Sequence, residues 1–244
     1  MLLHRLLWRF ARHRDDPVFY AMQATDAIRW LRRQGVPMGP GRRVIDLGCG
    51  HGVFGGELAR LGCDVTFADE QNFLLAEHRH RTFLPINLDR DDPASLGRHD
   101  LVVCSNVLEH LARPRRFLAM ASGLVAPGGC LYLSWTNWLS PWGGHEFSPW
   151  HYLGPRHGPR IHDALGGRRF HTPGQNLFVT RIGEVLEWIR EDGQFEVHSM
   201  APRYYTELPW LMRCPGLREF LAWNAALLLR PVADGPPHAS RDVT

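Results

Sequence analysis

The sequence predicts an α/β protein with a doubly wound, mostly parallel sheet, and two observations lead to this prediction. Between residues 43 and 135, short runs rich in Val, Ile and Leu alternate with segments whose apolar residues recur at helical spacing. The first run ends in a glycine-rich turn, VIDLGCGHG, which leads directly into a helical segment. Because strands that alternate with helices form parallel sheets, their carboxyl ends face one common crevice, where ligands bind in this architecture.

The elements follow in order along the chain. Residues 16–34 have the apolar spacing of a helix, which stops at Gly35 and Pro37. The expected strands are 43–47, 63–68, 83–88, 99–106, 130–135, 195–205 and 222–231. The expected helices after the first strand are 53–62, 72–81, 107–111, 115–125 and 181–192, with mixed helical material at 208–221.

Composition indicates one domain with a local insertion, which the length of 244 residues favours over two full domains. From residue 137 to 176 the alternation stops and Gly, Pro, His, Arg and aromatic residues dominate, so this segment is expected to be a lid inserted after the fifth strand. The expected parts are an N-terminal helical cap (1–37), a cofactor-binding core (38–136), the lid (137–176), the C-terminal part of the sheet (177–231) and a disordered tail (232–244).

Charge and cysteine content narrow the range of partners. The formal net charge is +3, and the 28 basic residues, all of them arginine, are scattered among 25 acidic ones, so a nucleic-acid surface is not expected. The five cysteines include no C-x-x-C pair, which favours reduced thiols in a cytoplasm and argues against a zinc site. No run approaches the ~18 apolar residues of a membrane span. Residues 1–14 could form a basic amphipathic helix that touches a membrane, although packing on the protein's own domain is favoured.

The glycine-rich turn after the first strand carries the strongest functional signal. Gly48, Gly50 and Gly52 lie where the strand turns into its helix, and each lacks the Cβ that would block a ligand's approach. Asp46, at the strand end, can accept hydrogen bonds from loop amides or bind a cationic ligand. Asp69 ends the second strand, where a carboxylate can bind both ribose hydroxyls of a nucleotide.

Two kinds of cofactor compete for this turn. The pattern Gly50-x-Gly52-x-x-Gly55 matches the G-x-G-x-x-G of dinucleotide sites, which keeps a nicotinamide-dependent oxidoreductase open. However, Asp46 lies two positions before the first glycine. A carboxylate there suits the sulfonium and amino group of S-adenosylmethionine, whereas it would repel a pyrophosphate. Charge therefore favours S-adenosylmethionine.

Four motifs together resemble the class I methyltransferases. They are D-L-G-C-G-x-G, the acidic pair in FADE, SNVLEHL and APGG, in this order between residues 43 and 135. The resemblance implies a Rossmann-like sheet of seven strands with an antiparallel last strand, S-adenosylmethionine as cofactor and S-adenosylhomocysteine as product. The residues that it assigns to cofactor binding are Asp46, Gly48, Cys49, Gly50, Asp69, Glu70, Asp89, Ser105 and Asn106.

The same resemblance implies where each of these residues binds. The loop from Asp46 to Gly50 meets the methionine portion, and Asp69 meets the ribose. Asp89 is the best match for the acidic residue that meets the adenine amino group, with Asp91 and Asp92 as rivals.

The end of the fourth strand is implied to lie at the reacting methyl. Ser105 and Asn106 are expected to line the methionine and the methyl group that is transferred. Glu109 and His110 follow in the same motif, and they are expected to be structural because similar enzymes carry this pair in the helix that starts there.

Most of the chain also resembles an uncharacterised actinobacterial, mycobacterial-type branch of methyltransferases. The segments DPVFY, WLSPWGGHEFSPWHYLG, PRYY and CPGLREFLAWNAALLLRP carry this resemblance, and the insertion departs from it at HDALGGRRFHTPGQN. The branch identifies no acceptor.

Aromatic residues in the insertion predict the acceptor pocket. The expected substrate-binding residues are Trp135, Trp138, Trp142, Trp150 and Tyr152, with Phe147 among them in the sequence. Flat aromatic surfaces suit a lipid, an aromatic ring or the apolar face of a sugar. The alternative is that these side chains only pack the insertion onto the sheet.

A hydroxyl acceptor must lose its proton, and histidine is the expected base. His145, flanked by Glu146, is the first candidate because imidazole titrates near neutral pH and a carboxylate can orient it. His151 is the second candidate. No metal site is expected, because the spacing of His145, Glu146 and His151 is not that of a helical zinc site.

The sequence therefore predicts a cytoplasmic, S-adenosylmethionine-dependent methyltransferase. It is expected to methylate a hydroxyl of a small hydrophobic or glycosylated metabolite, in natural-product (secondary metabolism) or cell-envelope biosynthesis of an actinobacterium. N- or C-methylation, an NAD-dependent oxidoreductase and a non-catalytic protein that binds S-adenosylmethionine stay as alternatives.

Overall fold

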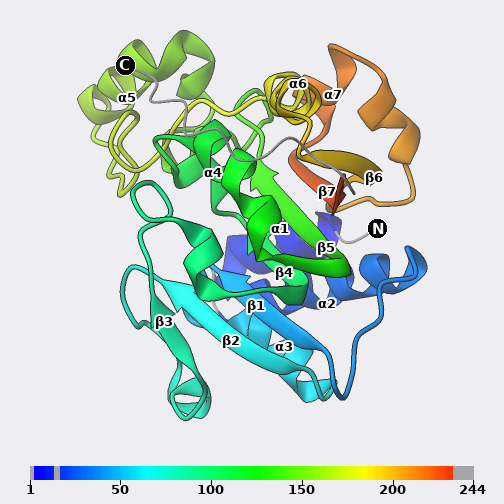
Figure 1. The fold of residues 1–244 in the computed structure, drawn as a ribbon. Coiled ribbons are helices and arrows are strands. Elements are labelled where there is room, and N and C mark those ends of the chain that lie inside the picture. Colours follow the sequence, from blue (N-terminus) through cyan, green and yellow to red (C-terminus); the bar gives the residue numbers. More distant parts are fainter. Residues whose placement is uncertain (1–2, 14–16, 233–244) are drawn as a thin grey trace.

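A seven-stranded sheet forms the centre of the protein in a computed structural model, which describes residues 3–13 and 17–232 (Figure 1). The strands are β1 (Arg43–Leu47), β2 (Asp64–Asp69), β3 (Phe83–Pro85), β4 (His99–Ser105), β5 (Val125–Thr136), β6 (Phe195–Pro202) and β7 (Asn224–Pro231). Their order is β3-β2-β1-β4-β5-β7-β6. The pairs among β1 to β5 are parallel, whereas β7 runs antiparallel to both β5 and β6. The predicted sheet, including its antiparallel last strand, is confirmed.

Helices cover both faces of the sheet. They are α1 (Leu3–His13), α2 (Pro17–Arg33), α3 (Val53–Arg60), α4 (Pro114–Ala121), α5 (Gly154–Ala164), α6 (Ile182–Asp192) and α7 (Leu217–Leu221). One face packs on α2 and α3 through residues such as Leu31 and Leu58. The other packs on α4 and α6 through Phe117 and Val185. Because both faces are covered, the central strands are almost continuously apolar, and their carboxyl ends are left as the place for a ligand.

Two predicted helices are only single 3₁₀ turns. The helix expected at 72–81 is wrong, since a turn at Ala76–His78 replaces it. There the side chain of Asn72 accepts a hydrogen bond from the Leu74 amide, which favours a turn over a helix start. The helix expected at 107–111 is a turn at Leu108–His110, which ends because Leu111 has an extended backbone conformation.

The segment 137–176, predicted to be an insertion, contributes two of the three residues of a separate small core. Trp138, Phe147 and Leu177 form a separate buried cluster. Short turns at His145–Phe147 and Trp150–Leu153 lead into α5, which lies at the edge of the molecule away from β6 (Figure 1). The predicted disordered tail lies outside the described residues, apart from Val232.

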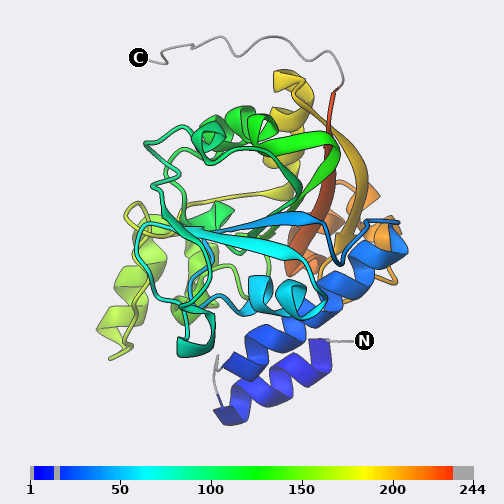
Figure 2. The same ribbon diagram turned by 60° about the horizontal axis from the view of Figure 1, so that its bottom comes forward.

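The N-terminal helices lie side by side under the sheet (Figure 2). Leu6 of α1 is buried, and the Leu3 amide donates to the carbonyl of Tyr204. The helix α1 therefore packs on the protein's own domain, as the amphipathic pattern of the N-terminal residues favours. None of the described helices is long and apolar enough to cross a bilayer.

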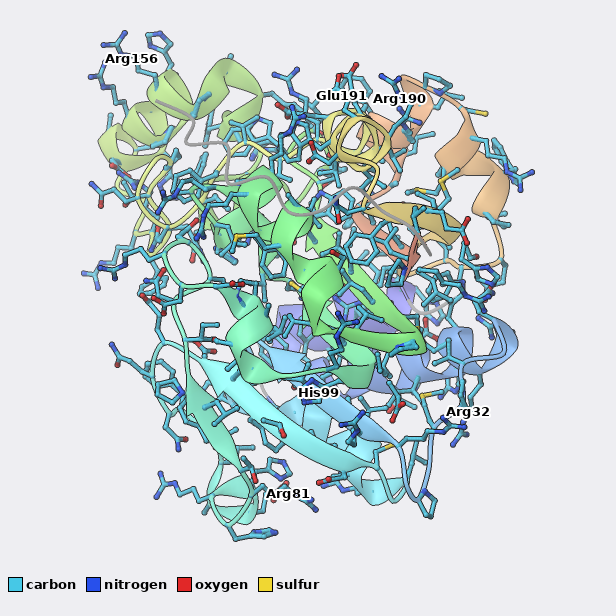
Figure 3. The ribbon with its side chains drawn as sticks, in the orientation of Figure 1. Arg32, Arg81, His99, Arg156, Arg190 and Glu191 are labelled. Atoms are coloured by element: carbon cyan, nitrogen blue, oxygen red, sulfur yellow. The ribbon has the colours of Figure 1, made fainter. Side chains whose placement is uncertain are left out.

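Arginine side chains are spread over the surface. Figure 3 places Arg32, Arg81 and Arg156 at separate edges of the molecule, on α2, before β3 and on α5. These arginines therefore belong to separate parts of the fold.

Candidate functional site

A cavity of about 340 Å³ opens at the carboxyl ends of β1, β4 and β5. Six of the nine predicted cofactor residues line it, namely Asp46, Gly48, Cys49, Gly50, Ser105 and Asn106. Two other predicted residues, Trp142 and His145, also line it. The rest of the lining was not predicted; it consists of Phe19, Tyr20, Gln23, His51, Val53, Phe54, Glu109, His110, Thr136, His171, Arg203 and Tyr204. Ligand binding at this edge is what the topology predicts.

The glycines of the turn are required for different reasons. Gly48 and Gly50 both have positive φ, at 61° and 50°. A Cβ on Gly48 would lie 2.4 Å from Cγ2 of Val107, whereas a Cβ on Gly50 would meet no described atom within 4 Å. At Gly52 a Cβ would lie 2.6 Å from the Leu74 side chain, so this glycine allows close packing of the loop on the fold. Gly50 alone has the open space that a cofactor needs.

Asp46 is a buried carboxylate at the bottom of the cavity. It is 3% exposed, and its Oδ2 accepts a hydrogen bond of 2.8 Å from the Gly55 amide at the start of α3. Burial raises the pKa of Asp46 to about 7, and the nearby carboxylate of Asp69 acts in the same direction. A positively charged ligand would favour the ionised form of Asp46. The buried carboxylate therefore suits the cationic groups of S-adenosylmethionine.

Cys49 presents a protonated thiol to the cavity. Burial and the carboxylates of Asp46 and Asp69 raise the pKa of this thiol well above its usual range. Cys49 is therefore suited to contact a ligand and is unsuited to act as a nucleophile.

Asp69 shapes the turn from the neighbouring strand. Its Oδ2 accepts from the Gly50 amide at 2.8 Å and its Oδ1 from the Glu70 amide at 2.7 Å. Glu70 is exposed, hydrogen-bonds Asn87 and lies 3.6 Å from Arg90. Neither Asp69 nor Glu70 is part of the cavity lining, which covers the half of the site around Asp46.

The candidates for the adenine contact all bind backbone amides. Asp89 accepts from the amides of Ala112 and Arg113, at 3.0 and 2.7 Å, just before α4. Asp91 accepts from the Asn87 amide, and Asp92 caps a 3₁₀ turn. Asp89 thus has both oxygens engaged and does not line the cavity, because those amides lie beside a helix start and need acceptors.

Asn106 joins the ends of three strands. It has a φ of 58°, and its side-chain oxygen accepts from Arg203 Nη1 at 2.6 Å and from Asn224 Nδ2 at 3.0 Å. Ser105 before it is hydrogen-bonded to Ser134 of β5. Arg203 is only 3% exposed, and its guanidinium is held in the cavity wall.

Three histidines meet at the rim of the cavity. We call His110, His145 and His171 the three-histidine cluster; their ring centroids are 4.4–5.6 Å apart. Two come from the insertion and one follows β4. Burial, together with the two neighbouring rings, lowers the pKa of His145 to about 3. His145 lines the cavity as predicted. However, an imidazole with so low a pKa is a weak proton acceptor, so His145 is poorly suited to the predicted role of general base.

The other two residues expected in catalysis do not line the cavity. His151 is fully buried, and its Nε2 lies 2.9 Å from the carbonyl oxygen of Ser140. It therefore stabilises the insertion. Glu146 binds Nδ1 of His171 at 2.9 Å, so it orients a histidine, but a different one from the expected His145.

Only one of the five aromatic residues expected to bind substrate lines the cavity, namely Trp142. Trp135 is fully buried in the core between β5 and α6, because alternation along the strand turns it away from the site. Trp138 packs on Phe147. Trp150 and Tyr152 lie in the turn before α5; Tyr152 is exposed, and its hydroxyl donates to the Leu139 carbonyl. The packing alternative therefore describes Trp135 and Trp138.

A smaller space adjoins the cavity on its aromatic side. We call it the apolar annex; it has about 50 Å³ and shares with the cavity Phe19, Thr136, Trp142 and Tyr204. The rest of its wall is Leu3, Leu6, Leu7 and Trp223. The aromatic residues of the annex lie far apart in the sequence; they are Phe19, Trp142, Tyr204 and Trp223. Three of them lie in segments that carry the resemblance to the mycobacterial-type branch, namely Phe19 in DPVFY, Tyr204 in PRYY and Trp223 in CPGLREFLAWNAALLLRP.

Comparison with known proteins gives a consistent result. Residues 10–168 match the model of a family described as "Methyltransferase domain". An uncharacterized methyltransferase of Mycolicibacterium gilvum is 32% identical over 243 residues, which cover 93% of each chain. One of Mycobacteroides abscessus is also 32% identical, over 87% of each chain.

Solved structures share the fold at lower sequence identity. An S-adenosylmethionine-dependent methyltransferase from Mesorhizobium loti superimposes with a TM-score of 0.57 at 20% identity, covering 84% of this chain and 97% of that one. Magnesium protoporphyrin IX methyltransferase from Synechocystis, solved with bound S-adenosylhomocysteine, gives 0.53 at 18% identity, covering 87% and 84%.

Proposed function

The chain belongs to the methyltransferase domain family, and on that premise we propose that it methylates a hydroxyl group on a small acceptor with an apolar part. It is a methyltransferase, and S-adenosylmethionine is its cofactor. The cofactor supplies an activated methyl group on a sulfonium. The protein has to bind both partners, align them and manage the acceptor's proton.

The cofactor half of the cavity fits that cofactor. Gly50 leaves open space beside the loop, and buried Asp46 offers a negative charge to the cationic groups. We assign Ser105 and Asn106 to the methionine end and the carboxylate of Asp69 to the ribose. Asp69 keeps lone pairs for the ribose beyond the two amides that it already binds.

The observation that carries the proposal is a buried carboxylate in the acceptor half. Glu109 is 1% exposed; its Oε1 accepts from the Thr136 amide at 2.8 Å, and its Oε2 has no hydrogen-bond partner among the described residues. A buried carboxylate oxygen calls for a donor. A hydroxyl of the acceptor supplies one, and its proton can pass to Oε2 as its oxygen attacks the methyl.

The apolar annex supports an acceptor with a hydrophobic portion. Its aliphatic and aromatic wall lies next to the cavity and can bury an alkyl chain or a ring. Such an acceptor agrees with a hydrophobic or glycosylated metabolite of natural-product or cell-envelope biosynthesis. The mycobacterial relatives support an actinobacterial setting for it.

The test combines ligand binding with turnover. Calorimetry is expected to detect S-adenosylmethionine at micromolar to millimolar concentration and no NADH. Production of S-adenosylhomocysteine is then followed with matched acceptors: long-chain alcohols, phenols and glycosides, the same compounds with the hydroxyl blocked as a methyl ether, and the corresponding amines.

The expected result is turnover with hydroxyl compounds alone, and a loss of at least about 100-fold in kcat in Glu109→Gln with unchanged cofactor affinity. The amide keeps the bond to Thr136 but is no base. Turnover with amines alone would establish the N-methyltransferase alternative, and NADH binding in place of S-adenosylmethionine would overturn the proposal. Glu187→Gln, a change of an exposed carboxylate on α6 away from the cavity, is the matched control.

A further inference from the structure

The three rings of the three-histidine cluster lie close together, but they are not hydrogen-bonded to one another as they would be in a hydrogen-bond network. Each ring offers one nitrogen, and these three atoms all lie within 4.8 Å of one another. In the described part of the chain, no hydrogen bond joins any two of the rings. Three imidazoles that face each other without bonding leave a space that a shared partner would explain.

Two of the three rings are oriented from outside the cluster. Nδ1 of His110 lies 2.7 Å from the carbonyl oxygen of Asn176, and Nδ1 of His171 lies 2.9 Å from the carboxylate of Glu146. Both neighbours are acceptors, so these nitrogens carry the protons and Nε2 of each ring keeps its lone pair. A histidine that binds a metal through one nitrogen usually donates from the other to such a carbonyl or carboxylate.

His145 completes the arrangement with a strained backbone. Its φ is 50°, and its Nδ1 is buried without a hydrogen-bond partner among the described residues. A Cβ on Gly143, two residues earlier, would lie 1.8 Å from the Trp138 carbonyl oxygen, so the chain just before His145 is tightly packed. Strain at a non-glycine residue persists where the surrounding structure enforces it, and it is common at functional sites.

We propose that His110, His145 and His171 bind one zinc-class divalent cation at the rim of the cavity. Imidazole nitrogen suits Zn²⁺, Co²⁺ and Ni²⁺, whereas Mg²⁺ and Ca²⁺ prefer oxygen. Nitrogens around tetrahedral Zn²⁺, with bonds of about 2.0–2.1 Å, lie roughly 3.3 Å apart. The rings therefore draw together when the ion binds. The sequence predicted no metal site because the set considered there, His145, Glu146 and His151, lacks the spacing of a helical zinc site. His110 and His171 lie far from His145 in the sequence and approach it only in the folded chain.

Three protein ligands leave a fourth position, as in catalytic zinc sites. All three histidines line the cavity, so that position faces the acceptor. This part of the inference rests on the proposed function: the ion would hold the acceptor hydroxyl and ease loss of its proton. The proton passes to Glu109 or water, an oxygen lone pair forms the C–O bond, and the S–C electron pair returns to sulfur.

The site also joins two parts of the fold. His145 and His171 belong to the insertion, whereas His110 follows β4. The insertion already contacts this region through Asn176, and the Phe178 amide donates to the Glu109 carbonyl. A bound ion would add a third link and fix the insertion over the cavity.

The experiment is a metal titration of the full chain after removal of bound metal with a chelator. One equivalent of Co²⁺ is expected to give the visible absorption of a four-coordinate site, which Zn²⁺ abolishes by competition and Mg²⁺ does not. Each of His110→Ala, His145→Ala and His171→Ala is expected to weaken Zn²⁺ binding at least 100-fold. Glu146→Gln is expected to weaken it about 10- to 100-fold, because Glu146 only orients His171.

His157→Ala is the matched control, since this exposed histidine of α5 lies in the same insertion but outside the cluster. Zn²⁺ affinity equal to that of the parent protein in the three cluster variants would overturn the inference, as would the absence of any stoichiometric Co²⁺ or Zn²⁺ binding. Calorimetry with S-adenosylmethionine on the same samples separates the two proposals. Cofactor binding without metal binding refutes only the metal site, and metal binding without cofactor binding refutes only the proposed function.

Discussion

Two glycines of the cofactor turn have different roles, since Gly48 is needed for packing and Gly50 leaves space for a ligand. Gly48 and Gly50 have similar positive φ values, yet only Gly48 would place a Cβ against another side chain. A non-glycine residue in this conformation costs roughly 1–2 kcal/mol. Overpacking of the kind expected at Gly48 adds typically about 1–3 kcal/mol.

Gly48→Ala is therefore expected to lower the free energy of unfolding by about 1–3 kcal/mol more than Gly50→Ala does. Val107→Ala should recover part of the loss in Gly48→Ala, because it removes the clashing methyl groups, and should be additive with Gly50→Ala. Denaturant unfolding of the three single and two double variants measures both differences. Equal losses at the two glycines would contradict this account of the turn.

The protonation state of Asp46 is expected to make cofactor binding depend on pH. Its pKa near 7 in the free protein means that the carboxyl is partly protonated at neutral pH, and a cationic ligand favours the ionised form. Binding of S-adenosylmethionine is expected to release protons around pH 7. Affinity should rise with pH below this pKa, by up to about tenfold per unit, and level off above it.

Calorimetry in buffers of different ionisation enthalpy measures the released protons. Asp46→Asn removes the titrating group, so its weaker binding should be independent of pH over the range from about pH 5.5 to 7. A parent protein with the same flat profile would show that Asp46 does not face the cationic part of the ligand.

At the scale of elements, α6 begins with a cap supplied from a distant part of the chain. Glu219 of α7 accepts from the amides of Ile182 and Gly183, at 3.1 and 2.7 Å. Amides in the first turn of a helix lack partners within the helix, and a carboxylate also interacts well with the helix dipole. This contact joins two helices that pack at the far end of the sheet from β3 (Figure 1).

Glu219→Ala is expected to cost about 1–2 kcal/mol of unfolding free energy, the usual range for a lost helix cap. Glu187→Ala, on the exposed surface of α6, is the control and should change stability by less than about 0.5 kcal/mol. Denaturant unfolding distinguishes them. Cofactor affinity should not change in either variant, and equal stability of the two would show that the cap contributes little.

The elements that sequence could predict were those with local signals. The resemblance to class I methyltransferases is confirmed, and with it the strands, their antiparallel last member and the glycine turn. The acceptor side was harder because its residues meet only in three dimensions. His171 reaches His110 through an insertion without periodicity, and Trp135, which looked like a substrate contact, faces the core because of its place on β5.

For the whole molecule, cofactor binding should be visible as thermal stability. A ligand that binds only the folded state at 100 times its Kd adds about 2.7 kcal/mol. For a chain of this size, that corresponds to a rise in Tm of roughly 5–11 °C. S-adenosylmethionine and S-adenosylhomocysteine are both expected to produce it in a thermal scan. NADH at equal concentration should leave Tm unchanged, and a matching rise with NADH would reopen the dinucleotide interpretation.

The position of α1 has a practical consequence for every one of these measurements. Leu3, Leu6 and Leu7 form part of the apolar annex, so sequence added at the N-terminal end is joined close to the proposed acceptor end of the cavity. An affinity tag there would change the surroundings of the proposed substrate pocket, and a polyhistidine tag would in addition compete for the proposed cation. KM and metal stoichiometry should therefore be measured after an N-terminal tag has been removed, or with the tag at the other end of the chain.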